Sequence, residues 1–218
     1  MNFEVKMIRI KDDYVSNAYA DYCAPSWRGF NFSFYDAITP TNLAEQRGIN
    51  FGIKTSGRPH SPTEKACWYS QYNLWKECAR ANKPYLVLEH DALLVNPKAI
   101  TFNPHLMVQF FGQHAMEAVM YHPAFAKKLV DLAGKTNVDK GPMGFVDTYL
   151  GFFSKNRQSR YGDPHARYQG MSAPVKSVLD LNMGNTVRHP EKETIVDRAN
   201  RIDKDLFVIV DLKDYYTQ

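Results

Sequence analysis

Residues 85–92 read Tyr-Leu-Val-Leu-Glu-His-Asp-Ala, and this stretch decides how the chain is expected to fold. Its first four residues form an apolar run of strand length, which is typical of a central parallel strand buried on both faces. The run stops at Glu89-His90-Asp91, and apolar residues resume at 92–95. Open α/β sheets bind ligands at the carboxyl ends of their strands. We therefore expect Glu89-His90-Asp91 to lie in a binding crevice.

The segments before this stretch alternate between strand and helix patterns. Residues 3–10 alternate apolar and polar side chains, which predicts a strand with one buried face. Residues 12–24 have a helical pattern with Asp12 or Asp13 as the cap, and residues 30–34 predict a second strand. The order strand, helix, strand indicates an α/β sheet with a crossover connection.

A marked helix start precedes the central strand. Ser61 is expected to cap this helix, Pro62 to occupy its first position and Glu64 to complete a capping box. The helix is expected to run to about Ala81, whereas the glycines and prolines of residues 41–60 predict a loop. Weaker patterns predict strands at 106–111, at 115–121, within 174–190 and at 207–210. Helices are predicted at 123–132 (stopped by Gly134), around 146–150 and at 191–205. Residues 154–171 are predicted to form a mobile loop.

The composition is that of an ordinary globular protein. The chain has 218 residues, of which 44% are hydrophobic and 23% charged, so a disordered or fibrous class is excluded. The net charge of +4 is mild and leaves a polyanionic partner open. Because no stretch resembles a membrane span or a signal peptide, we expect a soluble, cytoplasmic protein. Cys23, Cys67 and Cys78 show no disulfide or zinc pattern, and we expect them to be reduced and buried.

The acidic residues of the triplet suggest a metal site. Glu89 and Asp91 lie one residue apart, and their carboxylates would converge on Mg²⁺ or Mn²⁺ if the backbone turns between them. His189 follows a predicted strand and is a candidate third ligand. The alternative is that the two acids are merely solvated. His90 is interpreted as a structural partner or as part of the site.

Asp147 is the second acidic candidate. It lies between apolar neighbours, where burial would raise the pKa of its carboxyl towards that of a useful general base. An aspartate before a short helix is also a favoured N-cap. Both interpretations stay open on the sequence alone.

Five motifs in order carry a resemblance to a known family. The helix Glu64-Lys65-Ala66-Cys67-Trp68-Tyr69-Ser70-Gln71 resembles a family helix with Glu, a Gly-Cys pair and Ser-His, and Glu89-His90-Asp91 resembles the family's Glu-Asp-Asp triplet. The other motifs are residues 7–10 with 34–37, residue 121 with 126–129, and residues 146–150. In this order they resemble glycosyltransferase family 25, the lipopolysaccharide-biosynthesis type, over roughly residues 7–190.

The resemblance implies a fold and an activity. It implies an α/β fold: a single GT-A-like, Rossmann-like domain over residues 1–218 with a mixed, mainly parallel sheet flanked by helices. Residues 1–100 would mainly bind the donor, and residues 101–218 mainly the acceptor. The implied reaction is an inverting transfer from a nucleotide sugar, with UDP the expected nucleotide, assisted by Mn²⁺ or Mg²⁺. The resemblance places Glu89 and Asp91 at the donor diphosphate and Asp147 near the acceptor. We expect Asp91 and Asp147 to be catalytic, and Glu89, Asp91 and the candidate His189 to be metal ligands. The residues expected to bind the donor are Ile10, Lys11, Asp36, Glu64, Ser70, Glu89 and His90.

Three departures from the family pattern bear on the activity. His90 replaces the middle acid of the triplet, Gln71 replaces the histidine of Ser-His, and Ala66 replaces the glycine. His90 softens the expected ligand set. A catalytically inactive module that binds a glycan or nucleotide is therefore the alternative function.

Two acceptor classes agree with the basic charge. One is a lipopolysaccharide-type glycan. The other is a hydroxymethylated or glycosylated base in bacteriophage DNA, which the Arg- and Lys-rich residues 155–168 would contact through phosphates.

Overall fold

The computed structural model describes residues 3–54, 56–112, 117–150 and 173–178. Within them, five strands form one sheet in the order β2-β1-β3-β6-β5. β1 pairs in parallel with β2 and β3, whereas β6 runs antiparallel to β3 and β5. A separate two-stranded sheet pairs β4 with β7. The strands are β1 (Glu4–Arg9), β2 (Phe32–Asp36), β3 (Tyr85–Leu88), β4 (Ala92–Leu94), β5 (Val108–Phe110), β6 (Ala118–Tyr121) and β7 (Val175–Ser177).

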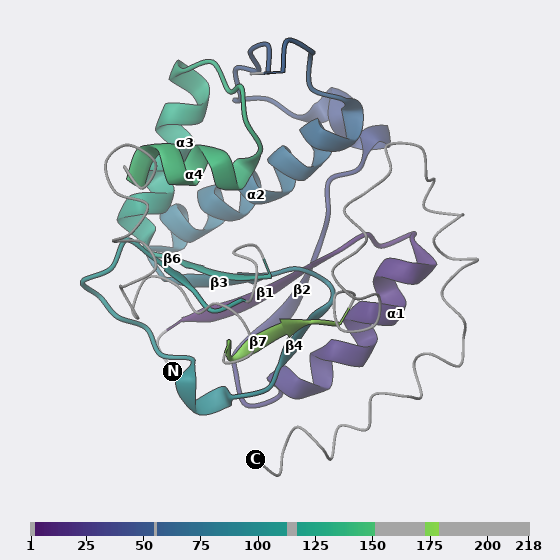
Figure 1. Cartoon of the computed structure of the whole chain (residues 1–218), viewed down its shortest axis with the longest axis vertical. Coiled ribbons are helices and arrows are strands. Elements are labelled where there is room, and N and C mark those ends of the chain that lie inside the picture. The colour runs from purple at the N-terminus through teal and green to yellow at the C-terminus, as the bar shows by residue number, and fades with distance from the viewer. Residues whose placement is uncertain (1–2, 55, 113–116, 151–172, 179–218) are drawn as a thin grey trace.

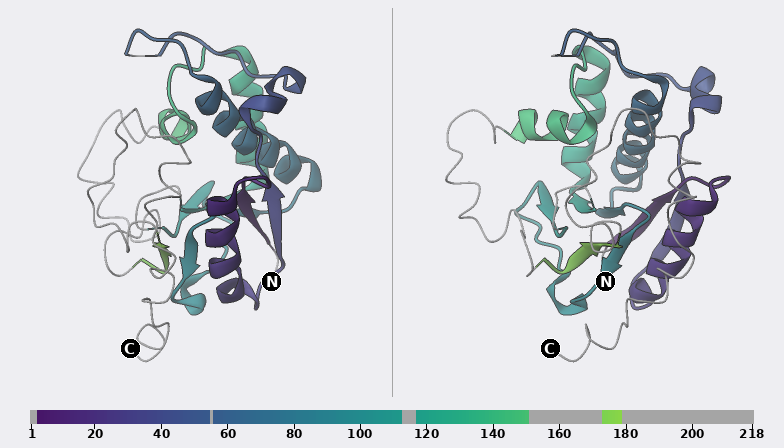
Figure 2. Two further views of the ribbon diagram at one scale, coloured as in Figure 1. Left: turned by 90° about the vertical axis from the view of Figure 1, so that its right-hand side faces the viewer. Right: turned by 45° about the vertical axis from the view of Figure 1, so that its right-hand side comes forward.

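Helices cover both faces of the five-stranded sheet (Figures 1 and 2). α1 (Tyr14–Cys23) lies on one face and continues into the short 3-10 helix η1 (Ala24–Trp27). α2 (Pro62–Ala81), α3 (Pro123–Lys135) and α4 (Pro142–Leu150) lie on the other face. Only β6 opposes the direction of the other four strands, so the predicted α/β class with a mixed, mainly parallel sheet is confirmed. Two further 3-10 helices, η2 (Pro40–Glu45) and η3 (Pro97–Ala99), lie in the connections.

The predicted capping box of α2 is present. Ser61 Oγ accepts a hydrogen bond from the Glu64 backbone N–H at 3.2 Å, and Glu64 Oε2 accepts one from the Ser61 N–H at 2.8 Å. The helix ends at Asn82, whose φ of 49° places it in the left-handed region that terminates helices. Local signals alone therefore predicted this helix correctly.

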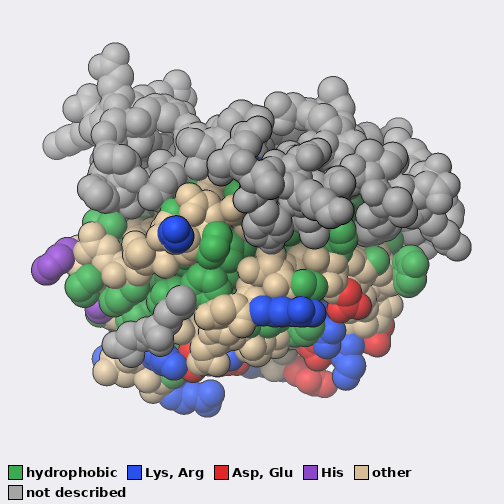
Figure 3. All heavy atoms as spheres, turned by 90° about the horizontal axis from the view of Figure 1, so that it is seen from below, with side chains coloured by type: hydrophobic (Ala, Val, Ile, Leu, Met, Phe, Trp, Pro, Cys, Tyr) green, Lys and Arg blue, Asp and Glu red, His purple; other side chains and the backbone are tan. Residues whose placement is uncertain are grey.

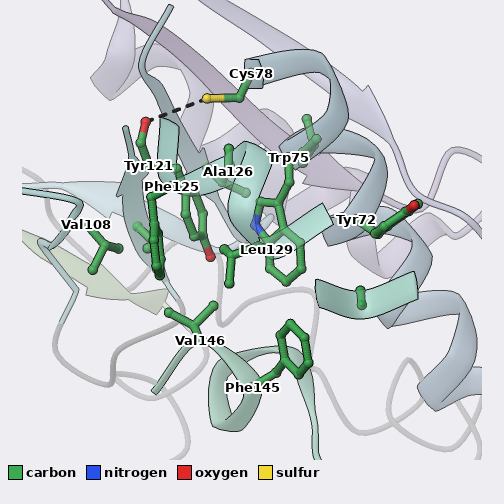
Figure 4. Close-up of a cluster of buried hydrophobic side chains, with 14 of the residues drawn as sticks. Tyr72, Trp75, Cys78, Val108, Tyr121, Phe125, Ala126, Leu129, Phe145 and Val146 are labelled. Atoms are coloured by element: carbon green, nitrogen blue, oxygen red, sulfur yellow. Dashed lines mark hydrogen bonds between the residues drawn. The ribbon is translucent and has the colours of Figure 1, made fainter. Parts of the chain in front are cut away.

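Aromatic side chains fill the core between the sheet and the three helices (Figure 4). The ring of Phe145, on α4, lies 5.0 Å from that of Trp68 and 6.5 Å from that of Trp75, measured between centroids. Both tryptophans are fully buried on α2. Edge-to-face and offset contacts of this kind add to the stabilisation from burial. Phe145 thus holds α4 against α2.

Two local expectations were wrong, and one of the two interpretations left open for Asp147 is excluded. Gly134 lies inside α3, which continues to Lys135, because a glycine is tolerated where packing maintains the helix. Cys67 is exposed rather than buried. Asp147 is not an N-cap, because α4 already begins at Pro142. The predicted segments 154–171, 191–205 and 207–210 lie outside the described residues.

Candidate functional site

The candidate site lies at the carboxyl ends of the three parallel strands. Met7 pairs with Leu88, and Arg9 pairs with Asp36, so the ends of β1, β2 and β3 lie at one edge of the sheet. All four residues of β3 are buried, as the apolar run predicted. The triplet Glu89-His90-Asp91 forms the turn that follows, and its position at this edge is confirmed.

The Glu89 side chain belongs to the α2 side of the sheet. Its backbone N–H donates to the carbonyl of Glu117, 3.1 Å away, which continues the pairing of β3 with β6. Desolvation of the Cys67 thiol, and then the negative charges of Glu89 and Glu64, raise the pKa of Cys67 to about 11. The Glu89 carboxylate therefore lies close to the first turns of α2.

Asp91 faces the α1 side instead. It is 3% exposed, and its Oδ2 accepts a hydrogen bond from the Ser177 hydroxyl. Burial raises the pKa of Tyr19 to about 12, and the negative charge of Asp91 adds to this shift. Burial and then Asp91 also raise the pKa of the Cys23 thiol. Tyr19 and Cys23 both lie on α1, so the two acids of the triplet have their described neighbours on opposite sides of the sheet.

His90 contacts α1. Its ring centroid lies 6.0 Å from that of Tyr19, at an interplanar angle of 49°. This geometry agrees with the interpretation of His90 as a structural partner. Its predicted part in donor binding stays a prediction.

The turn offers carboxylates that suit a hard cation, but the described residues do not supply a complete set of ligands. Carboxylate oxygens are the ligands that Mg²⁺ and Mn²⁺ prefer. Asp91 Oδ2 accepts the hydrogen bond from Ser177. Among the described residues, no three His, Cys, Asp or Glu side chains gather closely enough to hold a metal ion. His189, the predicted third ligand, lies outside the described part of the chain.

The predicted donor contacts on the β1 and β2 ends have partners of their own. The Ile10 N–H donates to Ser16 Oγ at 2.9 Å, and the Lys11 carbonyl accepts from Asn17 Nδ2 at 2.7 Å. These bonds hold the start of α1 against the end of β1. The carboxylate of Asp36, 49% exposed, accepts from Arg9 Nε at 3.2 Å.

The Arg9 guanidinium is held by a second contact. It lies 4.3 Å from the ring centroid of Phe34, a cation–π arrangement. The ion pair with Asp36 and this ring together place one cation and one anion at the same strand ends that carry the triplet.

Glu64 is engaged within the protein. Besides its cap, its carboxylate accepts from Lys54 Nζ at 2.5 Å and from Arg58 at 3.0 and 3.2 Å. Desolvation alone would raise the pKa of Glu64. The hydrogen bonds from Lys54, the Ser61 N–H and Arg58 outweigh it and lower that pKa to about 2. In this structure the side chain stabilises the start of α2.

Ser70 joins α2 to the chain after β2. Its Oγ accepts from the Ile38 N–H at 2.9 Å and donates to the Ala66 carbonyl at 3.0 Å. The next residue, Gln71, is 3% exposed, and its Oε1 has no hydrogen-bond partner within the described part of the chain. A buried amide oxygen without a partner is uncommon and costs free energy unless a ligand or water satisfies it.

Three buried polar residues near the triplet were not predicted. Ser177 contacts Asp91, and Glu117 and Lys176 are 3% and 4% exposed. Burial lowers the pKa of Lys176, and the nearby charge of Glu117 opposes this shift. None of the three belongs to a sequence motif. The pairing of β7 with β4 brings Lys176 and Ser177 to this region, and the hydrogen bond from the Glu89 N–H to the Glu117 carbonyl places Glu117 there.

Two curated relatives of this chain are glycosyltransferases. The lacto-N-neotetraose biosynthesis glycosyltransferase LgtB of Neisseria meningitidis serogroup A is 34% identical over 76 residues, which are 34% of this chain and 27% of LgtB. LgtE of Neisseria gonorrhoeae is 29% identical over 106 residues, 47% of this chain and 38% of LgtE. The chain thus matches well under half the length of these relatives.

Two glycosyltransferases of solved structure match this chain at low similarity. One is a glycosyltransferase involved in the glycosylation of the major capsid of PBCV-1, with a TM-score of 0.41 and 11% identity over 70% of this chain and 77% of that one. The other is the galactosyltransferase LgtC, with a TM-score of 0.42 and 12% identity over 80% of this chain and 86% of that one.

The family model covers the part of the chain that carries the site. The model described as glycosyltransferase family 25, LPS biosynthesis protein, matches residues 16–133, more than half of the chain. The matched range includes α2, β3 and Glu89-His90-Asp91. The chain therefore belongs to glycosyltransferase family 25.

Proposed function

We propose that this protein transfers a sugar from a nucleotide-sugar donor to a hydroxyl group of a glycan. The observation that carries the proposal is the acidic turn at the carboxyl edge of β1–β3, within the range matched by the family model. A strand-end crevice in an α/β fold is where a nucleotide is expected to bind. Residues 1–100 would supply most donor contacts, and residues 101–218 most acceptor contacts.

The donor would bind along the ends of β1, β2 and β3. The nucleotide, expected to be UDP, would contact Asp36, His90 and the backbone of Ile10 and Lys11. Glu89 and Asp91, with His189, are the proposed ligands of Mn²⁺ or Mg²⁺. Because the neighbours of the two acids lie on opposite sides of the sheet, the turn would have to bring their carboxylates together when the cation binds. The cation would stabilise the negative charge of the leaving diphosphate. Glu64 and Ser70 would act by shaping the first turns of α2, since their polar atoms are already bonded.

Asp147 would be the general base of an inverting transfer. It lies two residues after Phe145, which holds α4 against α2, so the backbone that carries Asp147 has a defined place. The carboxylate would accept the proton of the acceptor hydroxyl as the oxygen attacks the sugar carbon opposite the leaving diphosphate. In-line attack of this kind inverts the configuration at that carbon.

A glycan is the acceptor that the relatives favour. LgtB and LgtE are named for the biosynthesis of lacto-N-neotetraose, an oligosaccharide. On the face shown in Figure 3, the Lys and Arg side chains of the described residues are scattered among acidic and apolar ones. Residues 155–168, on which a DNA acceptor depended, lie outside the described residues. The described helices include none that is long and apolar enough to cross a membrane.

The test is a panel of nucleotide sugars, with and without Mn²⁺, measured by thermal shift and by product formation on oligosaccharide acceptors. A bound donor should raise the melting temperature by mass action. Transfer by the wild-type protein that is lost in Asp147→Asn, with donor binding retained, would support the proposal. Donor binding with no transfer to any acceptor would instead favour a non-catalytic binding module, and no binding at all would sink both.

A further inference from the structure

The turn that carries Asp91 is bonded to β7, a strand that begins 84 residues after Asp91 in the chain. β4 and β7 pair with Ala92 opposite Ser177. The Ser177 hydroxyl donates to Asp91 Oδ2, and the Val178 N–H donates to the Asp91 carbonyl oxygen at 3.0 Å. Both the side chain and the backbone of Asp91 are therefore bonded to this one strand.

The other side of the turn is held by η1. The indole Nε1 of Trp27 donates to the Ala92 carbonyl at 2.9 Å, and the Leu94 N–H donates to Ser26 Oγ at 3.1 Å. The backbone on the C-terminal side of Asp91 is thus anchored on both edges of β4. The position of its Cα is set by these contacts, while the direction of its carboxylate depends on the bond from Ser177.

This bond matters because the carboxylate is buried. At 3% exposure, Asp91 has lost most of its hydration, which is costly for a charged group unless hydrogen bonds replace the water. A hydrogen bond to an ionised acceptor is roughly twice as strong as one between neutral groups. The Ser177 hydroxyl supplies such a hydrogen bond to the Asp91 carboxylate.

We propose that Ser177 is a positioning residue of the donor site, whose hydroxyl fixes the Asp91 carboxylate so that the remaining oxygen, Oδ1, faces the donor diphosphate and its cation. The inference rests on the proposed function and deepens it. Two distant segments then form the site, since the turn after β3 supplies the acid and β7 supplies the group that orients it.

The test compares Ser177→Thr with Ser177→Val. These side chains have nearly the same shape and differ in one hydroxyl, so any added crowding is common to both. Thr should keep activity within about threefold of wild type, whereas Val should lower kcat/KM for the donor by about 10- to 100-fold, the loss expected for a mispositioned supporting group. The acceptor KM should stay unchanged in both variants, and the Mn²⁺ concentration needed for half-maximal activity should rise in the Val variant alone.

Ser33→Ala is the matched control. Ser33 lies on β2 and accepts a hydrogen bond from Lys6 Nζ at 3.0 Å, away from the triplet. Removal of the Ser33 hydroxyl should leave kcat/KM for the donor unchanged. Crystal structures of the two Ser177 variants add a readout independent of activity, namely a rotated Asp91 carboxylate with Val and an unmoved one with Thr.

The outcomes separate the two proposals. Equal activity of Thr and Val variants overturns the role of Ser177 and leaves the transferase intact. Equal loss in both assigns Ser177 a packing role and also overturns the inference. A wild-type protein that neither binds nor turns over nucleotide sugars overturns the proposed function and the inference that rests on it.

Discussion

The indole Nε1 of Trp27 donates a hydrogen bond to the backbone carbonyl of Ala92 across 2.9 Å. Trp27 is fully buried, and the two residues are separated by 65 positions in the chain. The bond joins the end of the α1 layer to the first residue after Asp91. We therefore expect this one hydrogen bond both to stabilise the fold and to fix the backbone beside the candidate site.

Trp27→Phe should destabilise the protein while keeping most of the aromatic packing. The Ala92 carbonyl would lose its indole donor, and a buried acceptor without a partner costs about 1–3 kcal/mol. The measurement is the free energy of unfolding from urea titration. Tyr14→Phe is the control, because Tyr14 is 73% exposed and should change stability little. An unfolding free energy equal to wild type in Trp27→Phe would contradict the importance of this bond.

Glu64 should give stability that depends on pH. Its pKa is about 2 in the folded protein, against an ordinary value of 4.5. The stabilisation is therefore fully present above about pH 4.5 and is lost as the pH falls towards about 2. The difference in unfolding free energy between wild type and Glu64→Gln should shrink over this window. Glu45→Gln, at an exposed position, controls for the removal of one negative charge. A difference that is constant from pH 6 to pH 3 would argue against the ion-paired cap.

Gly112→Ala should destabilise the region beside the triplet. A Cβ at this position would overlap Glu117 Oε2 and approach the Ala118 nitrogen at 3.2 Å. Because Glu117 is buried, the overlap forces a shift that we expect to cost about 1–3 kcal/mol, as overpacking usually does. Gly29→Ala is the matched control, since a Cβ there meets nothing within 4 Å. Calorimetric melting temperatures that fall equally in both variants would show that crowding at Glu117 is not the cause.

Asp91→Asn should abolish most of the transfer activity and leave the fold intact. The amide oxygen can still accept the Ser177 hydrogen bond, but the negative charge at the donor diphosphate is lost. We expect kcat/KM to fall about 100-fold or more, the scale seen when one electrostatic group of an active site is removed. Circular dichroism should be unchanged, and Asp131→Asn, on the exposed side of α3, should retain full activity. Full activity of Asp91→Asn would exclude the triplet as the donor site.

Cys67 should report on the charge of Glu89. Its residue surface is exposed, yet desolvation of the thiol and then the charges of Glu89 and Glu64 raise the pKa of Cys67 to about 11. Since the thiolate is the reactive form, alkylation by iodoacetamide at pH 8 should be slow. Glu89→Gln should lower that pKa and speed the reaction severalfold. Mass spectrometry of the labelled Cys67 peptide measures the rate, and an unchanged rate would place the Glu89 carboxylate away from α2.

Local rules in the sequence were sufficient for several elements. The capping box of Ser61 and Glu64 depends on residues three apart, and the strand 85–88 depends on one unbroken apolar run. Interactions of this range involve residues that are close together in the chain, so the position of the triplet at a strand end could be predicted from them. The resemblance of the ordered motifs to family 25 extended this to a class of chemistry.

The tertiary structure decided what surrounds the triplet. The pairing of the strands places Glu89 near α2 and Asp91 near α1. The pairing of β7 with β4 brings Ser177 to Asp91. Those contacts join residues far apart in the chain, where no spacing or periodicity encodes the partner. By itself the sequence determined which acids end the central strand. Only the tertiary structure decided which groups surround them, because the hydroxyl that bonds the Asp91 carboxylate comes from a segment far along the chain.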